Sequence, residues 1–163
     1  MDPAFGEALI RLLPGLRRYA MSLSRRADLA DDLVQASVER AIRASGSYDP
    51  ASRLEPWLFR IARNAFIDMT RRQRTEGVQV DVFDSPETLS EDGTRVTEAR
   101  LMLRATQAAI RELPAEQAEI LHLICIEELS YAEAAEVLDI PKGTVMSRLS
   151  RARLALAERL GIR

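Results

Sequence analysis

The sequence predicts an all-α protein: two small helical domains joined by a flexible acidic linker, the C-terminal one containing a helix-turn-helix. Ala, Leu, Arg and Glu dominate the 163 residues, with only seven Gly and seven Pro, a composition that favours helices. Apolar residues recur at three- and four-residue steps in two separate stretches. Between these stretches the periodicity disappears and acidic residues accumulate.

The first domain is expected over residues 1–76 and begins with a helix over about residues 5–24. A second helix should start near Asp28, whose side chain suits an N-cap, and should fade near Ser45. Residues 46–53, GSYDPASR, then predict a loop. We expect the first helix to bury one face, formed by Leu9, Leu12, Leu13, Leu16, Ala20 and Leu23.

A third helix should start at residues 54–56, because proline suits a first helical turn, and continue to about Arg74. At 100° per residue its side chains divide into two faces. The apolar face holds Leu58, Ile61, Ala62, Ala65, Phe66 and Met69. The opposite face holds Trp57, Arg60, Arg63, Asn64, Asp68, Arg71 and Arg74. We expect the first face to pack in the core and the second to form a basic stripe headed by an aromatic residue.

Residues 77–97 hold one Arg against five acidic residues and no continuous apolar face, so they predict the linker. Helical patterning returns in the second domain, expected over residues 98–163. Pro114 should open a short helix that carries apolar residues from Ile120 to Ile124.

Ser130 and Glu133 have the spacing of a capping box, so a short helix should start there and end near Leu138. A tight turn over residues 139–143 and a basic helix follow, which is the order of a helix-turn-helix. Val145, Leu149 and Ala152 should face inward. The outward side chains suit a major groove, and the candidate duplex-binding residues are Lys142, Thr144, Ser147, Arg148, Arg151 and Arg153. An ordinary helical hairpin with a solvated basic face is the alternative.

Charge and composition exclude several classes of protein. The net charge of −2 conceals a locally basic segment, since residues 141–163 hold six basic residues and only Glu158 as an acid. One cysteine, no secretion signal and no long apolar run predict a cytoplasmic protein without a transmembrane segment. His122 and Cys125 have an H-x-x-C spacing but are expected in or near the core, so no metal site, cofactor or enzymatic activity is predicted.

Three stretches in this order resemble the hallmark segments of extracytoplasmic-function sigma factors of the sigma-70 family: DDLVQASVERAI (31–42), WLFRIARNAFIDMTRRQR (57–74) and SYAEAAEVLDIPKGTVMSRLSRAR (130–153). The resemblance implies a bacterial factor that docks on RNA polymerase and directs promoter recognition and transcription initiation. It implies docking on the beta-prime clamp helices by Asp31, Asp32, Leu33, Gln35 and Glu39. Without the resemblance, a solvated face beside a normal core explains that segment equally well.

By the same resemblance, the third helix and the loop before it capture the unpaired strand of the minus-ten element, while the helix-turn-helix holds the minus-35 duplex. The implied single-strand contacts are Ser47, Tyr48, Asp49, Arg53, Trp57, Arg60, Arg63, Asn64, Arg71 and Arg72. A pocket and a stacking surface would offset the cost of extruding a base. For Trp57 alone, a core position is the competing interpretation.

The implied partners are core RNA polymerase, through its beta-prime clamp helices and beta flap, promoter DNA and an inhibitory anti-sigma factor, with no small-molecule substrate. Two small domains on a mobile linker leave apolar faces for such an inhibitor. The linker is either a strand that threads through polymerase or a solubilising tether. A stand-alone helix-turn-helix regulator is the alternative function. A pure protein-interaction module fits less well because Arg148, Arg151 and Arg153 are present.

Overall fold

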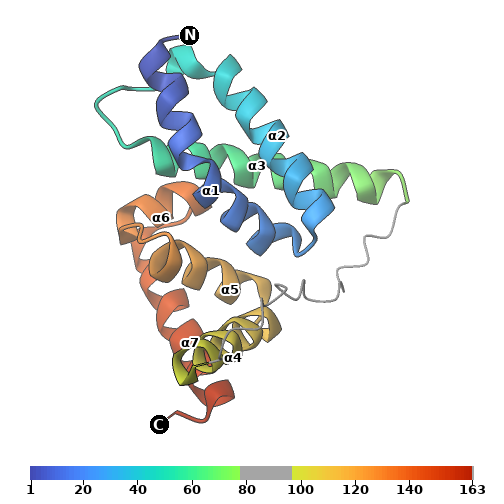
Figure 1. The fold of residues 1–163 in the computed structure, drawn as a ribbon, viewed down its shortest axis with the longest axis vertical. Coiled ribbons are helices and arrows are strands. Elements are labelled where there is room, and N and C mark those ends of the chain that lie inside the picture. The colour runs from blue at the N-terminus through green and yellow to red at the C-terminus, as the bar shows by residue number, and fades with distance from the viewer. Residues whose placement is uncertain (78–96, 163) are drawn as a thin grey trace.

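The computed structural model describes residues 1–77 and 97–162, and within these ranges the chain is helical without a β-strand (Figure 1). Residues 78–96, which hold most of the predicted linker, lie outside the described residues. The N-terminal half contains α1 (Pro3–Ser24), α2 (Ala27–Arg43), the short 3-10 helix η1 (Ser45–Ser47) and α3 (Leu54–Thr75). The C-terminal half contains α4 (Glu98–Glu112), α5 (Ala115–Leu121), the π-helical turn η2 (His122–Ile126), α6 (Tyr131–Leu138) and α7 (Lys142–Leu160). The predicted all-α class is confirmed.

Local side-chain chemistry explains where the first helices begin. The carboxylate of Asp2 accepts a hydrogen bond from the backbone N–H of Ala4 at 3.0 Å and caps α1. The prediction that Asp28 caps α2 is wrong, because the N-cap residue is Arg26 and Asp28 lies inside the first turn. The guanidinium of Arg26 contacts the Asp28 carboxylate at 2.7 Å, so this acid forms a local ion pair instead.

The core of the N-terminal half forms where α1 packs against α2 and α3. The predicted inward faces are confirmed, since Leu9, Leu16 and Ala20 of α1 are buried and Leu58 and Ala62 of α3 are fully buried. The helical period missed Phe59, which is also fully buried and contacts the ring of Tyr19 with centroids 5.1 Å apart. Phe59 therefore packs on a side of α3 that the apolar stripe did not include.

The helix-turn-helix has the predicted construction. The Ser130 hydroxyl accepts a hydrogen bond from the Glu133 N–H at 3.1 Å, and the Glu133 carboxylate accepts one from the Ser130 N–H at 2.9 Å. These reciprocal bonds form the capping box of α6 and confirm that prediction. Asp139 ends α6 in the left-handed conformation at φ 54°. Val145, Leu149 and Ala152 of α7 are buried as predicted.

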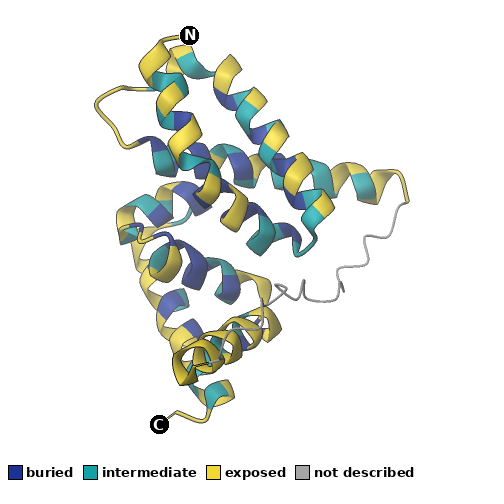
Figure 2. Ribbon diagram, viewed as in Figure 1, coloured by how far each residue is buried: buried dark blue, intermediate teal, exposed yellow. Residues whose placement is uncertain are grey.

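The two halves of the chain pack directly on each other. Helix α3 lies against α6, and α1 lies against α5 and η2, as Figure 1 shows at the crossing of the upper and lower helices. One hydrophobic cluster runs through both halves, and Figure 2 shows buried residues on both sides of this contact. This direct contact was not predicted, because the sequence analysis treated the halves as separate domains.

Helix α4 departs from the rest of the fold in its exposure. Its apolar residues Leu101, Met102 and Leu103 are each more than half exposed, and Ala109 is its buried residue. The helix packs mainly against α7. It therefore presents apolar side chains to solvent beside the helix-turn-helix.

Candidate nucleic-acid interface

A pocket of about 450 Å³ opens where the segment around η1 and the start of α3 meet α6. The lining brings together five of the predicted single-strand contacts, Ser47, Asp49, Arg53, Trp57 and Arg60. The other lining residues were not predicted, and they are Ser52, Pro56, Glu133 and Glu136. Its volume lies within the range of small-ligand sites. The pocket wall combines an indole ring and two guanidinium groups with the carboxylates of Asp49, Glu133 and Glu136.

An aromatic cluster surrounds Trp57, one of the residues that line the pocket. The ring of Trp57 lies 5.1 Å from that of Tyr48 and 6.0 Å from that of Phe5, measured between centroids. The Tyr48 hydroxyl donates a hydrogen bond to the Ser52 carbonyl at 2.6 Å. Trp57 is therefore partly buried against the core and also lines the pocket. Its contact with a DNA base stays a prediction.

The loop before α3 is held by its own side chains. The Asp49 carboxylate accepts a hydrogen bond from the Ala51 N–H at 3.0 Å. The Ser52 hydroxyl donates to the Asp49 carbonyl at 2.8 Å. Such local bonds are typical of Asx turns and define the loop backbone without help from another element. Ser47 also bonds locally, since its hydroxyl donates to the Ala44 carbonyl at 2.7 Å.

The cationic face of α3 continues away from the pocket. Arg60, Asn64 and Arg71 are exposed, in agreement with the predicted basic stripe, and Arg72, a predicted strand contact outside that stripe, is exposed as well. Arg63 differs, because it is half-buried and its Nε donates to the Glu119 carboxylate at 2.9 Å. Four of these five α3 residues therefore present their polar groups to solvent.

The predicted polymerase contacts on α2 divide into exposed residues and one core residue. Asp31, Asp32, Gln35 and Glu39 are exposed, and Asp31 accepts a hydrogen bond from Arg17 at 3.1 Å. Leu33 does not fit the prediction, because it is fully buried in a cluster with Ala20, Ala30 and Ala65. Leu33 belongs to the inward stripe of α2, and the four polar residues form its outward face.

The outward face of α7 holds the predicted duplex-binding residues. Lys142, Ser147, Arg151 and Arg153 are exposed, and Thr144 and Arg148 are half-buried. A guanidinium nitrogen of Arg148 lies 3.8 Å from a carboxylate oxygen of Glu116 on α5. At this distance the contact is a weak ion pair. The face therefore carries hydroxyl groups and guanidiniums along one side of a helix, a pattern suited to a DNA groove.

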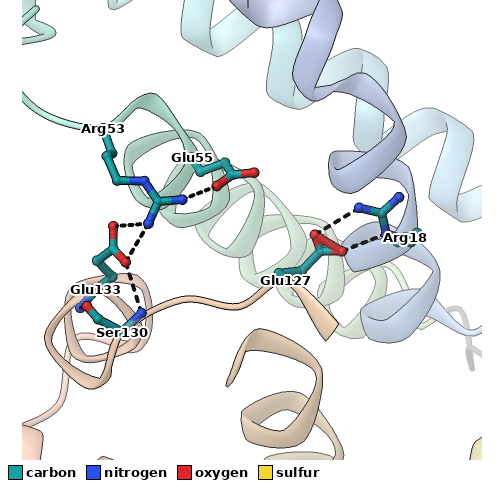
Figure 3. A network of polar contacts seen from close by, with 6 residues as sticks. All are labelled: Arg18, Arg53, Glu55, Glu127, Ser130 and Glu133. Atoms are coloured by element: carbon teal, nitrogen blue, oxygen red, sulfur yellow. Dashed lines mark hydrogen bonds and ion pairs between the residues drawn. The ribbon is translucent and has the colours of Figure 1, made fainter. Parts of the chain in front are cut away.

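Ion pairs of Arg18, Arg53 and Arg63 join the two halves, and none of them was predicted from the sequence. Arg18 of α1 points toward Glu127, and Arg53 points toward Glu133 of α6 (Figure 3). The Nε and Nη2 atoms of Arg18 donate to the two oxygens of Glu127 at 2.7 and 3.2 Å. The Nη1 atom of Arg53 lies 2.7 Å from both oxygens of Glu133. The third pair joins Arg63 to Glu119, which also accepts a hydrogen bond from the Tyr19 hydroxyl at 2.7 Å.

His122 and Cys125 do not share one environment. His122 is buried, as predicted, with its ring stacked 5.9 Å from that of Tyr19. Cys125 is exposed, so the expectation of a core or near-core position is wrong for it. The π-helical turn at residues 122–126 changes which side chains face inward, and the ordinary helical period did not anticipate it. In residues 1–77 and 97–162 no cluster of His, Cys, Asp or Glu is suited to a metal ion.

Glu127 makes the contact between the halves sensitive to pH. Burial by itself would raise the pKa of Glu127. The hydrogen bonds and charges of His122 and Arg18 lower this pKa by more than burial raises it, so the pKa lies below its ordinary value. A carboxylate whose pKa is lowered on folding stabilises the folded state while it is ionised. This contribution to the unfolding free energy is fully present above the pKa of the unfolded chain, about 4.3, and is lost as the pH falls through the pKa of the folded state. We therefore expect the Glu127→Gln variant to lose less unfolding free energy on acidification than the wild type. Urea unfolding between about pH 3 and pH 6 measures this.

The exposed neighbour Glu128 provides the control for this prediction. The Glu128→Gln variant should keep the wild-type pH dependence, because it leaves the contacts of Glu127 with Arg18 and His122 in place. Identical acid sensitivity of the wild type and the Glu127→Gln variant would contradict the assigned role of Glu127.

None of the described helices is long and apolar enough to serve as a membrane span. Fold and side-chain chemistry together define a helical protein with a polar pocket between its two halves and a helix-turn-helix in its C-terminal half. A helix-turn-helix with an exposed basic face is typical of DNA-binding proteins.

Comparison with known families and proteins agrees with this class. The model of sigma-70 region 2 matches residues 9–76, and that of sigma-70 region 4 matches residues 103–156. The chain is 38% identical over 149 residues to the ECF RNA polymerase sigma factor EcfG of Rhodopseudomonas palustris, covering 91% of this chain and 81% of the relative. It is 34% identical over 141 residues to the ECF RNA polymerase sigma factor SigM of Bacillus subtilis, covering 85% and 84%.

Two solved structures resemble the whole chain. The sigma factor RpoE of Bartonella quintana, solved with the anti-sigma factor NepR, superposes with a TM-score of 0.77 at 34% identity, covering 99% of both chains. CnrH, solved with the cytosolic domain of CnrY, superposes with a TM-score of 0.68 at 28% identity, covering 97% of this chain and 88% of CnrH. The chain belongs to the extracytoplasmic-function sigma factors of the sigma-70 family. It directs RNA polymerase in promoter recognition and transcription initiation, as the sequence predicted.

Proposed function

We propose that the two halves divide promoter recognition, with residues 1–76 acting on polymerase and the minus-ten element, residues 77–97 linking, and residues 98–163 acting on the minus-35 element. The observation that carries the proposal is the pairing of a pocket beside Trp57 with a separate basic helix face on α7. A pocket with an aromatic wall suits an extruded base, whereas a helix with outward guanidiniums suits duplex DNA. The proposed role is binding and positioning, without a catalytic step of its own.

In the N-terminal half, an unpaired base enters the pocket and the strand follows α3. Ser47, Asp49 and Trp57 line the pocket, and the Tyr48 ring packs against the indole ring of Trp57. Stacking of a base on an aromatic side chain contributes about 1–3 kcal/mol. The cationic groups then hold the phosphates, and these are Arg53, Arg60, Arg63, Arg71 and Arg72, with Asn64 beside them.

The outward face of α2 docks on the clamp helices of polymerase through Asp31, Asp32, Gln35 and Glu39. All four residues are exposed, and an acidic face suits a basic partner surface. Leu33 supports this face from within the core. Promoter recognition with RNA polymerase takes place on chromosomal DNA, so we assign the chain to the cytoplasm.

An anti-sigma factor controls this activity. Two similar proteins, RpoE of Bartonella quintana and CnrH, were solved in complexes, with the anti-sigma factor NepR and with the cytosolic domain of CnrY. The exposed apolar residues Leu101, Met102 and Leu103 of α4 supply a surface for a protein partner. An inhibitor seated there would compete with the docking of the C-terminal half on the beta flap. Failure of every co-purifying protein to silence transcription would contradict this control.

The Arg148→Ala variant tests the proposed division of labour. We expect run-off transcription from genomic promoter fragments with core polymerase to fall about tenfold or more, because one base or phosphate contact contributes about 1–3 kcal/mol. Binding to core polymerase, measured by gel filtration, should survive. The matched control is Arg159→Ala, on the same helix but paired with Glu112 at 2.9 Å. Unchanged promoter selectivity in the Arg148→Ala variant would count against the assignment of α7 to the minus-35 element.

A further inference from the structure

The face of α7 that points away from the core begins with a row of small residues. The buried residues of this helix fix the inward direction. At about 100° per residue, the opposite side is formed by Gly143, Ser147, Ser150 and Leu154, and all four are exposed. The first three, which we call the small row, lie toward the N-terminal end of α7. Because their side chains are short, the helix backbone can come close to a molecule that contacts this face.

Gly143 has no internal reason to be a glycine. A Cβ atom at this position would meet no other atom of the protein within 4 Å, and the residue does not have a positive φ. Glycine is unfavourable in a helix because it loses more backbone freedom on folding than any other residue. One established use of glycine is the close approach of the backbone to a ligand. The open space at Gly143 therefore fits a close approach of α7 to DNA.

The side chains that flank the small row are hydrogen-bond donors with one exception. The donors are Lys142, Thr144, Arg148, Arg151 and Arg153. The exception is Met146, whose apolar side chain is 51% exposed. On its flank of the helix, Met146 lies between Lys142 and Arg153, which are both exposed. When these two cations contact phosphates, the thioether between them lies over the groove.

The chemistry of the major groove limits what a methionine can recognise there. Thymine is the base that presents a methyl group, at C5, on its major-groove edge, and the other bases present hydrogen-bond donors and acceptors. A thioether donates no hydrogen bond and accepts only weakly, so its favourable contact is with the methyl group. Met146 lies in the first turns of α7, where the residues of a recognition helix reach base edges. Its unbranched side chain can adjust to the position of that group.

We propose that Met146 is a specificity-determining residue, which contacts the 5-methyl group of a thymine in the minus-35 duplex. The inference rests on the proposed assignment of α7 to that element. The hydroxyl and guanidinium groups of the same face suit phosphates and polar base edges, and Met146 adds the apolar contact that they cannot make. Removing one methyl group from water corresponds to about a fourfold change in affinity.

Replacing thymine by uracil tests the contact from the side of the DNA. The substitution removes the methyl group and keeps the Watson–Crick pairing groups. The probe is a promoter fragment that the reconstituted holoenzyme transcribes, with each thymine of its minus-35 element replaced in turn by deoxyuridine on either strand. Affinity is measured by competition with the labelled parent fragment. Uracil at one thymine, or at two adjacent ones, should weaken binding by the wild-type holoenzyme about fourfold.

The Met146→Ala variant tests the same contact from the side of the protein. It should bind the parent fragment about fourfold more weakly and should no longer distinguish thymine from uracil at that position. Met146→Leu restores an apolar side chain of similar volume and should restore the preference for thymine. The matched control is Leu154→Ala, which removes a 65% exposed apolar side chain farther along α7 and should keep the wild-type preference. Because Met146 and Leu154 are exposed, these substitutions should leave the fold intact.

The ratio of affinities for thymine and uracil distinguishes the possible failures. A wild-type holoenzyme that tolerates uracil at every position, or a minus-35 element without an A·T pair, would overturn the inference. A Met146→Ala variant that binds weakly but keeps the wild-type ratio would also overturn it, because the side chain would then act without contacting the methyl group. The proposed function fails separately, if Arg148→Ala leaves promoter selectivity unchanged.

Discussion

Replacing both Arg60 and Arg71 by alanine should lower promoter-directed run-off transcription by at least about tenfold, because two phosphate contacts along α3 are lost. Both side chains are exposed on the cationic face of α3. Within the described residues neither side chain forms an ion pair with the C-terminal half, so both guanidiniums are available to phosphates. The effect should fall on promoter opening, whereas binding to core polymerase should persist.

Salt dependence gives a second measurement of the same double variant. Each phosphate contact to a single strand contributes about 0.7 to the slope of log affinity against log salt. Loss of two contacts should therefore reduce the slope by about 1.4, as measured with a labelled strand bound to the reconstituted holoenzyme. The matched control replaces Arg11 and Arg43, two exposed arginines on α1 and α2. An unchanged slope in the Arg60 and Arg71 variant would show that α3 does not follow the strand.

The Phe59→Ala variant should lose about 3–5 kcal/mol of unfolding free energy. Phe59 is fully buried, its ring contacts Tyr19, and a ring atom would lie 3.8 Å from a Cβ at Gly15. Alanine there leaves a void at the point where α1, α3 and the C-terminal half meet, and the surrounding helices can fill it only in part. Urea unfolding followed by circular dichroism measures the loss.

Two outcomes decide whether Phe59 has this role. The control Ile10→Ala removes a side chain that is 67% exposed, so its effect should stay within about 0.5 kcal/mol. A loss below about 1 kcal/mol for Phe59→Ala would contradict full burial of the ring in solution. A large loss together with an expanded radius of gyration would place the ring at the contact between the halves.

The sequence by itself determined the helices, the capping box of α6 and the inward residues of α7. It also located the cationic face of α3, including the exposed Arg60 and Arg71. These features depend on interactions within a few residues, where the 3.6-residue period and cap chemistry act directly. For the same reason the family resemblance, which lies in three short stretches, could be recognised from residues alone.

Only the tertiary structure decided how the two halves meet. Arg18 and Glu127 are separated by 109 residues, and nothing in either local pattern indicates that they pair. Burial of Phe59 and the exposure of Cys125 likewise depend on helix docking and on the π-helical turn η2. The physical reason is range: periodicity reports which face of a helix is apolar, whereas long-range ion pairs and shared cores depend on which faces meet in space.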